Sequence, residues 1–133
     1  MNAERKPVIL VVEDDGGVFR LMRFHLEREG FDVRHAADGE KALLEFDRPD
    51  RPDLVILDVM LPYHNGYDLL ANLRGREAWA NVPVIMLSSS GRENDVVKGL
   101  SSGANDFLAK PFRPAEVVAR IRNLLEIATK AKE

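Results

Sequence analysis

The sequence contains no cysteine, and this absence excludes disulfide bonds, thiolate catalysis and sulfur-ligated metal sites. No apolar run approaches the length needed to span a bilayer, and the first residues lack the hydrophobic segment of a signal peptide. The net charge is −3, which argues against the basic surface of a protein that binds nucleic acid directly. We therefore expect a cytoplasmic protein that contacts neither a membrane nor, through this chain, nucleic acid.

The composition that is present is typical of one globular domain. The chain has 133 residues, 45% of them hydrophobic and 31% charged, so it can bury a core of ordinary size and is too apolar for a disordered protein. No linker is visible, and we expect a single domain over residues 1–133. Residues 1–6 are expected to form a tail, and residues 129–133 the end of the last helix or a tail.

Short runs of strand-forming residues alternate with segments of helical spacing. Strands are expected at Val8–Val12, Phe31–His35, Leu54–Leu57, Val84–Leu87 and Asp106–Ala109, and helices at Val18–Glu29, Glu40–Phe46, Tyr67–Leu73, Asn94–Leu100 and Ala115–Ala128. This alternation predicts an α/β fold with a doubly wound parallel sheet covered by helices on both faces. The central strands are nearly continuous apolar runs, as expected for strands buried on both faces.

The segment after the first strand shows a clear helical pattern. Its apolar residues Val18, Leu21, Met22 and Leu26 have the spacing of one helix face, and Gly30 follows as a stop signal. Pro114 suits the first turn of the last helix, because its missing N–H would be unpaired there in any case.

The histidines and the single tryptophan do not suggest a site. His25, His35 and His64 are scattered without the spacing of metal ligands, so we interpret them as surface or rim residues. Trp79 lies between two alanines before the fourth strand, and we expect it to pack beneath a loop.

Polar residues follow four of the five expected strands. They are Glu13, Asp14 and Asp15 after the first strand, Asp58 after the third, Ser88, Ser89 and Ser90 after the fourth, and Lys110 after the fifth. Ligands of open α/β sheets bind beyond the carboxyl ends of the strands, so these groups are expected to converge. Adjacent carboxylates at the end of a buried strand also require a positive partner, because like charges repel and desolvation disfavours ionisation.

These groups have the chemistry of a phosphoryl-transfer site. Carboxylate oxygens without cysteine or histidine favour Mg²⁺, which commonly shares its shell with a phosphate. Lys110 can pair with a carboxylate at rest and with a phosphoryl group when one is present, and Ser88 can donate a hydrogen bond to a phosphoryl oxygen. Asp58 stands alone among apolar residues and is the candidate nucleophile, which would form an acyl phosphate.

Taken singly, each residue has an ordinary structural interpretation. Asp14 could cap the first helix, and Asp58 could begin a turn. Ser88 could be a loop hydroxyl, Lys110 a solvated lysine and Phe107 a core residue. Their joint occurrence at four strand ends favours the functional interpretation.

Several motifs, in this order and spacing, resemble the receiver domain of two-component response regulators. They are "ILVVEDD", "PDLVILDVMLP", the Asn65-Gly66 pair, "PVIMLSSSG", "GLSSGANDFLAKPF" and "EVVARIRNLL", and the resemblance extends from Val8 to about Ala128. It implies a flavodoxin-like (βα)5 fold whose five-stranded parallel sheet has the strand order 2-1-3-4-5.

The resemblance also implies a role for each site residue. Asp58 would be the phosphoacceptor, and Mg²⁺ would be held by Glu13, Asp14, Asp58 and the backbone carbonyl of Met60. Ser88 and Lys110 would contact the phosphoryl group.

Conformational switching would involve Ser88 and Phe107. Tyrosine is frequent at the position of Phe107, and phenylalanine cannot make the outward hydroxyl hydrogen bond. The Lys110–Pro111 bond would be cis, and Met60 and Ser90 would tune the lifetime of the phosphoaspartate.

The implied function is a signalling switch and not an enzyme, apart from its own phosphorylation and dephosphorylation. A histidine kinase or phosphotransfer protein would phosphorylate Asp58 and so alter the face formed by residues 94–100, 106–109 and 115–128. That face would control a downstream protein or an output domain absent from this sequence.

The last helix resembles that of regulators which dimerise through this face and carry a winged-helix DNA-binding domain. The chain ends directly after this helix, and Val96, Ser101 and Ser102 stand where such regulators often have charges that pair with the Glu116 and Arg120 set. We therefore expect a single-domain, chemotaxis-regulator-like protein or an excised receiver module, either monomeric or a weak phosphorylation-dependent dimer.

Other classes fit less well. The main alternative is a receiver-like interaction module that works without phosphate, although such a module has no physical reason to keep Asp14, Asp58, Ser88 and Lys110. A Mg²⁺-dependent phosphatase usually needs a second carboxylate two residues after its nucleophile, where this chain has Met60. A flavin-binding protein would have its phosphate repelled by the acids after the first strand.

Overall fold

A parallel five-stranded sheet forms the centre of the structure, a computed structural model that describes residues 5–89 and 101–131. Its strands are β1 (Val8–Val12), β2 (Asp32–Ala36), β3 (Leu54–Asp58), β6 (Val84–Ser88) and β7 (Asp106–Ala109). They lie in the order β2-β1-β3-β6-β7, and every neighbouring pair is parallel. Counted along the sheet alone this is the order 2-1-3-4-5, so the predicted fold is confirmed.

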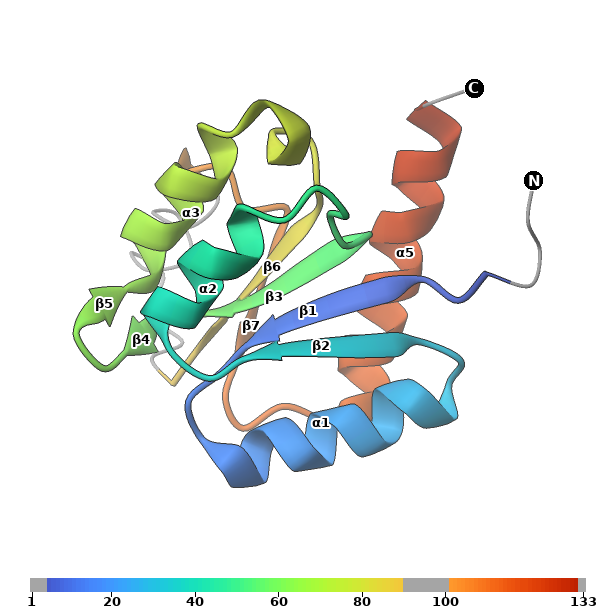
Figure 1. The fold of residues 1–133 in the computed structure, drawn as a ribbon. Coiled ribbons are helices and arrows are strands. Elements are labelled where there is room, and N and C mark those ends of the chain that lie inside the picture. The colour runs from blue at the N-terminus through green and yellow to red at the C-terminus, as the bar shows by residue number, and fades with distance from the viewer. Residues whose placement is uncertain (1–4, 90–100, 132–133) are drawn as a thin grey trace.

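Four α-helices are described, and they cover both faces of the sheet. They are α1 (Gly16–Arg28), α2 (Gly39–Phe46), α3 (Gly66–Arg74) and α5 (Pro114–Ala131). Figure 1 shows α2 and α3 on one face and α1 and α5 on the other. Pro114 opens α5 as expected, and the helix predicted at Asn94–Leu100 lies outside the described residues.

Successive residues of the central strand enter two separate cores. Leu54 and Ile56 pack with the helices α1 and α5, whereas Val55 and Leu57 pack with α2 and α3. All four side chains are fully buried, because side chains alternate between the faces of a strand. Burying each one contributes about 1.5–3 kcal/mol, which explains the uninterrupted apolar runs of the sequence.

The buried face of α1 differs from the predicted one. Phe19, Met22 and Leu26 are buried, whereas Leu21 is 48% exposed and Val18 is only half-buried. Both sets of residues have helical spacing, so periodicity alone does not choose between them. The orientation of α1 is instead set by packing, in which the Phe19 ring stacks on the ring of His35 in the edge strand β2.

A short hairpin between β3 and α3 was not predicted. Its strands β4 (Met60–Leu61) and β5 (His64–Asn65) pair antiparallel, and Tyr63 in the turn has a φ of 64°. Gly66 follows at the start of α3, where a Cβ would overlap the backbone of Asp58 and Val59. The close approach of α3 to the end of β3 therefore requires glycine.

Trp79 lies in the short 3₁₀ helix η1 (Glu77–Trp79) and is 1% exposed. Its ring packs edge-on against Phe46 of α2 with centroids 5.1 Å apart, so its predicted packing role is confirmed, although its partner is the core beneath α2 and α3. No helix within the described residues is long and apolar enough to cross a membrane.

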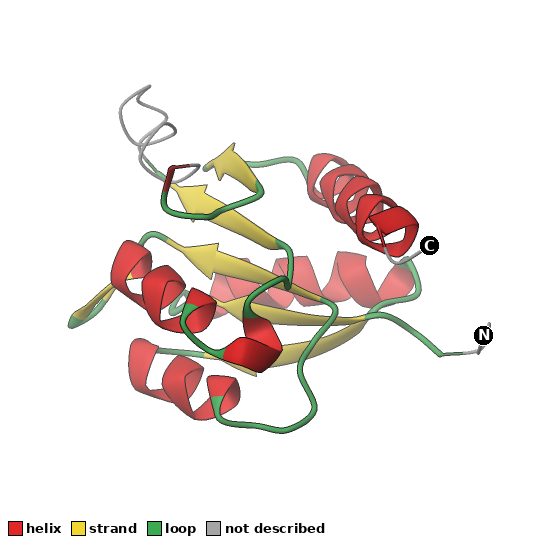
Figure 2. Cartoon of the chain, turned by 90° about the horizontal axis from the view of Figure 1, so that it is seen from above, coloured by secondary structure: helices red, strands yellow, loops and turns green. Residues whose placement is uncertain are grey.

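Figure 2 shows the strands of the sheet running in one direction, which brings their carboxyl ends to a common edge. The end of α5 lies toward the opposite edge in both overall views. The residues that follow the strands are therefore gathered at one edge, as parallel topology requires.

Candidate functional site

Four strand ends bring the candidate residues together. Glu13 follows β1, Asp58 ends β3, Ser88 ends β6 and Lys110 follows β7. The first three are 0%, 5% and 4% exposed, and they form the buried polar and charged set among the described residues. Backbone hydrogen bonds extend the sheet into the site, because the Lys110 N–H donates to the Ser88 carbonyl at 2.7 Å.

Lys110 supplies the positive charge that the acidic strand end requires. Its Nζ donates to Glu13 Oε1 at 2.6 Å and to Asp58 Oδ2 at 2.9 Å. Burial alone would lower the pKa of Lys110, but the hydrogen bonds and charges of both carboxylates outweigh burial and raise this pKa. The side chain therefore stays an ammonium ion, and it crosslinks strands that are distant in the sequence.

Among the residues that the structure describes, the one ammonium of Lys110 does not balance the negative charge of the site. Burial, with the addition of the neighbouring Asp58, raises the pKa of Glu13 to about 7, and Lys110 offsets only part of this shift. Two buried carboxylates beside one lysine leave an excess negative charge, to which the exposed Asp14 adds. The site therefore favours binding of a further cation.

The carboxylates have the geometry of a cation site. Glu13, Asp14 and Asp58 each offer an oxygen, and these oxygens all lie within 4.8 Å of one another. Asp58 Oδ1 also accepts the Met60 N–H at 3.1 Å, which holds the turn into the hairpin. An all-oxygen donor set, part buried and part open to solvent, fits Mg²⁺ with its retained waters.

Asp14 does not cap α1, because its neighbour performs that role. Asp15 Oδ1 accepts the N–H groups of Gly17 at 2.9 Å and Val18 at 3.1 Å. These hydrogen bonds, that of Val18 first, lower the pKa of Asp15. The capping interpretation of Asp14 is therefore wrong, and its carboxylate lies with Glu13 and Asp58 instead.

His35 contributes to the site although sequence analysis placed it at the rim. Its Nε2 lies 2.8 Å from the Glu13 carbonyl oxygen, to which an N–H at this position donates. The imidazole ring also stacks on Phe19, with centroids 3.5 Å apart. A histidine near the end of the strand beside β1 was the available signal, and the structure shows that it holds the backbone of Glu13.

The remaining predicted residues lie around this centre. Phe107 is half-buried and packs against the core beneath α2 and α3. Met60 is 73% exposed beside Asp58, and the Lys110–Pro111 peptide bond is cis. Ser90 lies outside the described residues.

The comparisons with known proteins agree on one family. A sequence model of the response regulator receiver domain matches residues 9–122. The chain is 42% identical over 128 residues to the alkaline phosphatase synthesis transcriptional regulatory protein PhoP of Bacillus subtilis. This match covers 94% of this chain and 52% of that protein. It is 47% identical over 114 residues to the DNA-binding response regulator MtrA of Mycobacterium tuberculosis, covering 86% and 48%.

The chain thus spans about half the length of the curated relatives it matches. Among solved structures, a putative response regulator from Chloroflexus aurantiacus is 38% identical, with a TM-score of 0.86. That match covers 92% of this chain and 99% of the other. The range matched by the family model includes the residues at the strand ends, from Glu13 to Lys110.

Proposed function

Because the chain belongs to the response regulator receiver domain family of two-component systems, we propose that it is a phosphorylation switch whose phosphoacceptor is Asp58. The observation that carries the proposal is the contact of Lys110 Nζ with Asp58 Oδ2 at 2.9 Å and with Glu13 Oε1 at 2.6 Å. This contact supports the proposal because it brings an ammonium ion to the buried carboxylate that ends the central strand.

Phosphorylation requires a carboxylate oxygen of Asp58 to attack phosphorus while the bond from phosphorus to the donor breaks. Both oxygens of Asp58 are held, one by the Met60 N–H and the other by Lys110. This fixes the orientation of the carboxylate before the donor arrives. The ammonium of Lys110 then neutralises charge on the transferred oxygens, and the Ser88 hydroxyl is placed at the neighbouring strand end to donate to one of them.

Glu13, Asp14, Asp58 and the backbone carbonyl of Met60 would hold Mg²⁺. When bound, the ion supplies charge neutralisation for the phosphoryl oxygens. The protein contributes three carboxylates whose mutual repulsion a cation would relieve. Burial, and then the neighbouring Asp58, raises the pKa of Glu13 to about 7, so Glu13 would lose its proton when it binds the ion.

Signal output is assigned to the face of β7 and α5. Asp106 Oδ1 accepts both the Phe107 N–H at 2.8 Å and Arg120 Nη1 at 2.9 Å. Movement of the Phe107 backbone would therefore alter an ion pair on the surface of α5. Phe107 and Ser88 would act as the switch pair, and Met60 and Ser90 would tune the lifetime of the phosphoaspartate.

The partners follow from the same proposal. The phosphodonor would be a histidine kinase or a phosphotransfer protein in the cytoplasm, and α1 presents Phe24 to it, 59% exposed. The output would be a downstream protein or a further domain, since the curated relatives are about twice as long and are named as regulators of transcription or DNA-binding proteins.

The test is the intact mass after incubation with acetyl phosphate, with and without Mg²⁺. We expect the wild type to gain one phosphoryl group only with Mg²⁺ and the Asp58→Asn variant to gain none. Asp32→Asn is the matched control, because Asp32 is an exposed carboxylate on β2 away from the site. Phosphorylation at another residue would contradict the assignment.

Beryllofluoride separates two explanations of a missing adduct, because it mimics a stable phosphoaspartate. Mg²⁺-dependent binding that requires Asp58 would show that the phosphorylated form is hydrolysed rapidly. Absence of binding to a folded protein would overturn the proposal and favour an interaction module that works without phosphate.

A further inference from the structure

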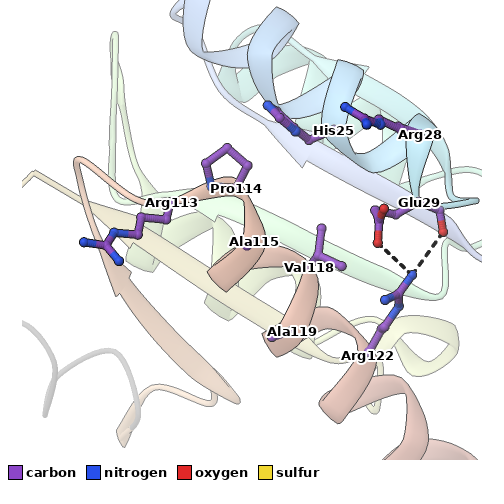
Figure 3. Close-up of a pocket in the computed structure, with 9 residues that line it drawn as sticks. All are labelled: His25, Arg28, Glu29, Arg113, Pro114, Ala115, Val118, Ala119 and Arg122. Atoms are coloured by element: carbon purple, nitrogen blue, oxygen red, sulfur yellow. Dashed lines mark hydrogen bonds and ion pairs between the residues drawn. The ribbon is translucent and has the colours of Figure 1, made fainter.

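A pocket separate from the acidic site lies between the end of α1 and the first half of α5. Its volume is about 650 Å³, and none of its lining residues belongs to the acidic site. Figure 3 shows His25 and Arg28 extending from α1, and Val118 and Arg122 facing them from α5. This volume lies within the range of roughly 300–1,000 Å³ that is typical of small-molecule sites.

The floor of the pocket is apolar and built from small residues. Val118 is 7% exposed, and Ala115 and Ala119 lie on the same side of α5 within the lining. Small side chains on α5 leave the space that a larger residue would fill. The floor is therefore suited to a compact apolar or planar group.

The rim of the pocket is positively charged. Its one acid, Glu29, is already paired, because Arg122 Nη2 lies 3.1 Å from Glu29 Oε1 and donates to the Glu29 carbonyl at 3.3 Å. Arg28 and Arg113 have no carboxylate partner among the residues that the structure describes. By contrast, the arginines Arg5, Arg34, Arg48 and Arg120 each form an ion pair.

Arg20 and Arg51 also have no carboxylate partner within the described part of the chain, but only Arg28 and Arg113 of these four line this pocket. Arginine is the side chain best suited to carboxylate and phosphate, because its planar guanidinium offers several donors and remains charged. We propose that this pocket binds a small organic anion, in which a phosphate or carboxylate contacts Arg28 or Arg113 and an apolar body covers Val118. This site is independent of phosphorylation at Asp58.

The probe for the test is 1-naphthyl phosphate, which joins a planar apolar body to a phosphate. It is titrated into the wild-type chain without divalent cations, and binding is followed by amide NMR. We expect saturable shifts at Ala115, Val118 and Ala119, with a Kd below about 1 mM, corresponding to about −4.1 kcal/mol. Neutral 1-naphthol and inorganic phosphate should each bind at least about tenfold more weakly, since each lacks one of the two contacts.

Charge-reversal variants test the two arginines. Arg28→Glu combined with Arg113→Glu should weaken binding at least about tenfold, because the anion then meets like charge. Arg51→Glu is the control, since Arg51 is an exposed arginine on the wall of a different pocket. Equal binding of 1-naphthol, unchanged affinity in the double variant, or shifts confined to Ser88 and Lys110 would each overturn the proposal. A negative result would leave the acetyl phosphate experiment unaffected.

Discussion

The imidazole ring of His64 occupies the space that a side chain at position 39 would need. A Cβ on Gly39 would overlap the ring, and Gly39 is buried at the first residue of α2. His64 lies in β5, in the hairpin that begins two residues after Asp58. This contact therefore joins the start of α2 to the hairpin that carries Met60.

Gly39→Ala is expected to destabilise the protein by about 1–3 kcal/mol, because the added methyl group must displace the ring of His64 or the helix. Adding His64→Ala should recover at least half of this loss, since the ring that clashes is then absent. Urea unfolding of both single variants and the double variant measures the effect.

Gly75→Ala is the matched control for this pair. A Cβ there meets the nearest atoms at 3.5 Å, which is ordinary contact, so stability should change by less than about 0.5 kcal/mol. Additive losses in the Gly39 and His64 double variant would show that the two residues do not share the space.

Arg74 is held by carbonyl oxygens rather than by a carboxylate. Its guanidinium donates to Gly103 O at 2.7 Å, to Val82 O at 2.6 Å and to Asn105 Oδ1 at 2.9 Å. Burial lowers the pKa of this arginine. The side chain thereby connects the end of α3 to the loops that lead into β6 and β7.

Arg74→Met should cost about 2–4 kcal/mol of unfolding free energy, because several half-buried carbonyl groups would lose their donor. Arg74→Lys should recover only part, since an ammonium does not reproduce the planar set of donors. Arg23→Met is the control, because the Arg23 side chain is exposed on α1 and makes only an i,i+4 ion pair with Glu27. A loss equal to that of Arg23→Met would contradict the bridging role.

Asp14 and Asp15 are adjacent, but substituting one should affect mainly Mg²⁺ affinity and substituting the other mainly stability. Asp15→Ala removes the N-cap of α1, so the melting temperature should fall by about 4 °C with little change in Mg²⁺ affinity. Asp14→Ala should weaken Mg²⁺ binding at least about tenfold and leave the metal-free melting temperature nearly unchanged. Thermal unfolding and calorimetric Mg²⁺ titration of both variants decide this, and a reversed pattern would exchange the two roles.

Stability and Mg²⁺ affinity should change with pH in opposite directions. The pKa of Glu13 is raised from 4.5 to about 7, mainly by burial. Glu13 therefore binds a proton more tightly in the folded protein than in the unfolded chain, and this proton binding stabilises the metal-free fold. The stabilisation is complete below pH 4.5 and is lost as the pH rises through about 7. Mg²⁺ needs the ionised carboxylate, so its affinity should rise by up to about tenfold per pH unit between roughly pH 5 and 7.

Urea unfolding of the metal-free protein and calorimetric Mg²⁺ titration, both across this pH range, measure the two trends. Glu13→Gln should flatten the pH dependence of stability, because the titrating group is gone. A flat profile in the wild type would show that Glu13 titrates near its ordinary pKa in the folded protein.

The sequence predicted the sheet well because each strand is a local signal. The run from Leu54 to Leu57 is apolar throughout, and such a run ending in a carboxylate indicates both a buried strand and its functional end. The expected strands differ from the observed ones by a residue at some ends, as at β2, which covers Asp32–Ala36. Strand ends fray and register is set by the neighbouring strand, so single-residue bounds are not encoded locally.

The sequence was less informative where two local solutions were equally good. Val18 and Leu21 have the same helical spacing as Phe19 and Met22, and only the packing of α1 on the sheet selected the second set. The hairpin after Asp58 was missed because its strands have two residues each. Such short pairs are too brief to show a periodicity in the sequence.

Residue types and their order along the chain were sufficient to determine that carboxylates, a hydroxyl and a lysine would meet at one edge of a parallel sheet. Tertiary structure alone decided the long-range contacts: Lys110 bridges Glu13 and Asp58, and His35 holds the backbone of Glu13. The physical reason is distance. Residues nearly a hundred positions apart in sequence come within hydrogen-bonding range only once the sheet has gathered the ends of β1, β3 and β7 at one edge, where the long Lys110 side chain reaches both carboxylates.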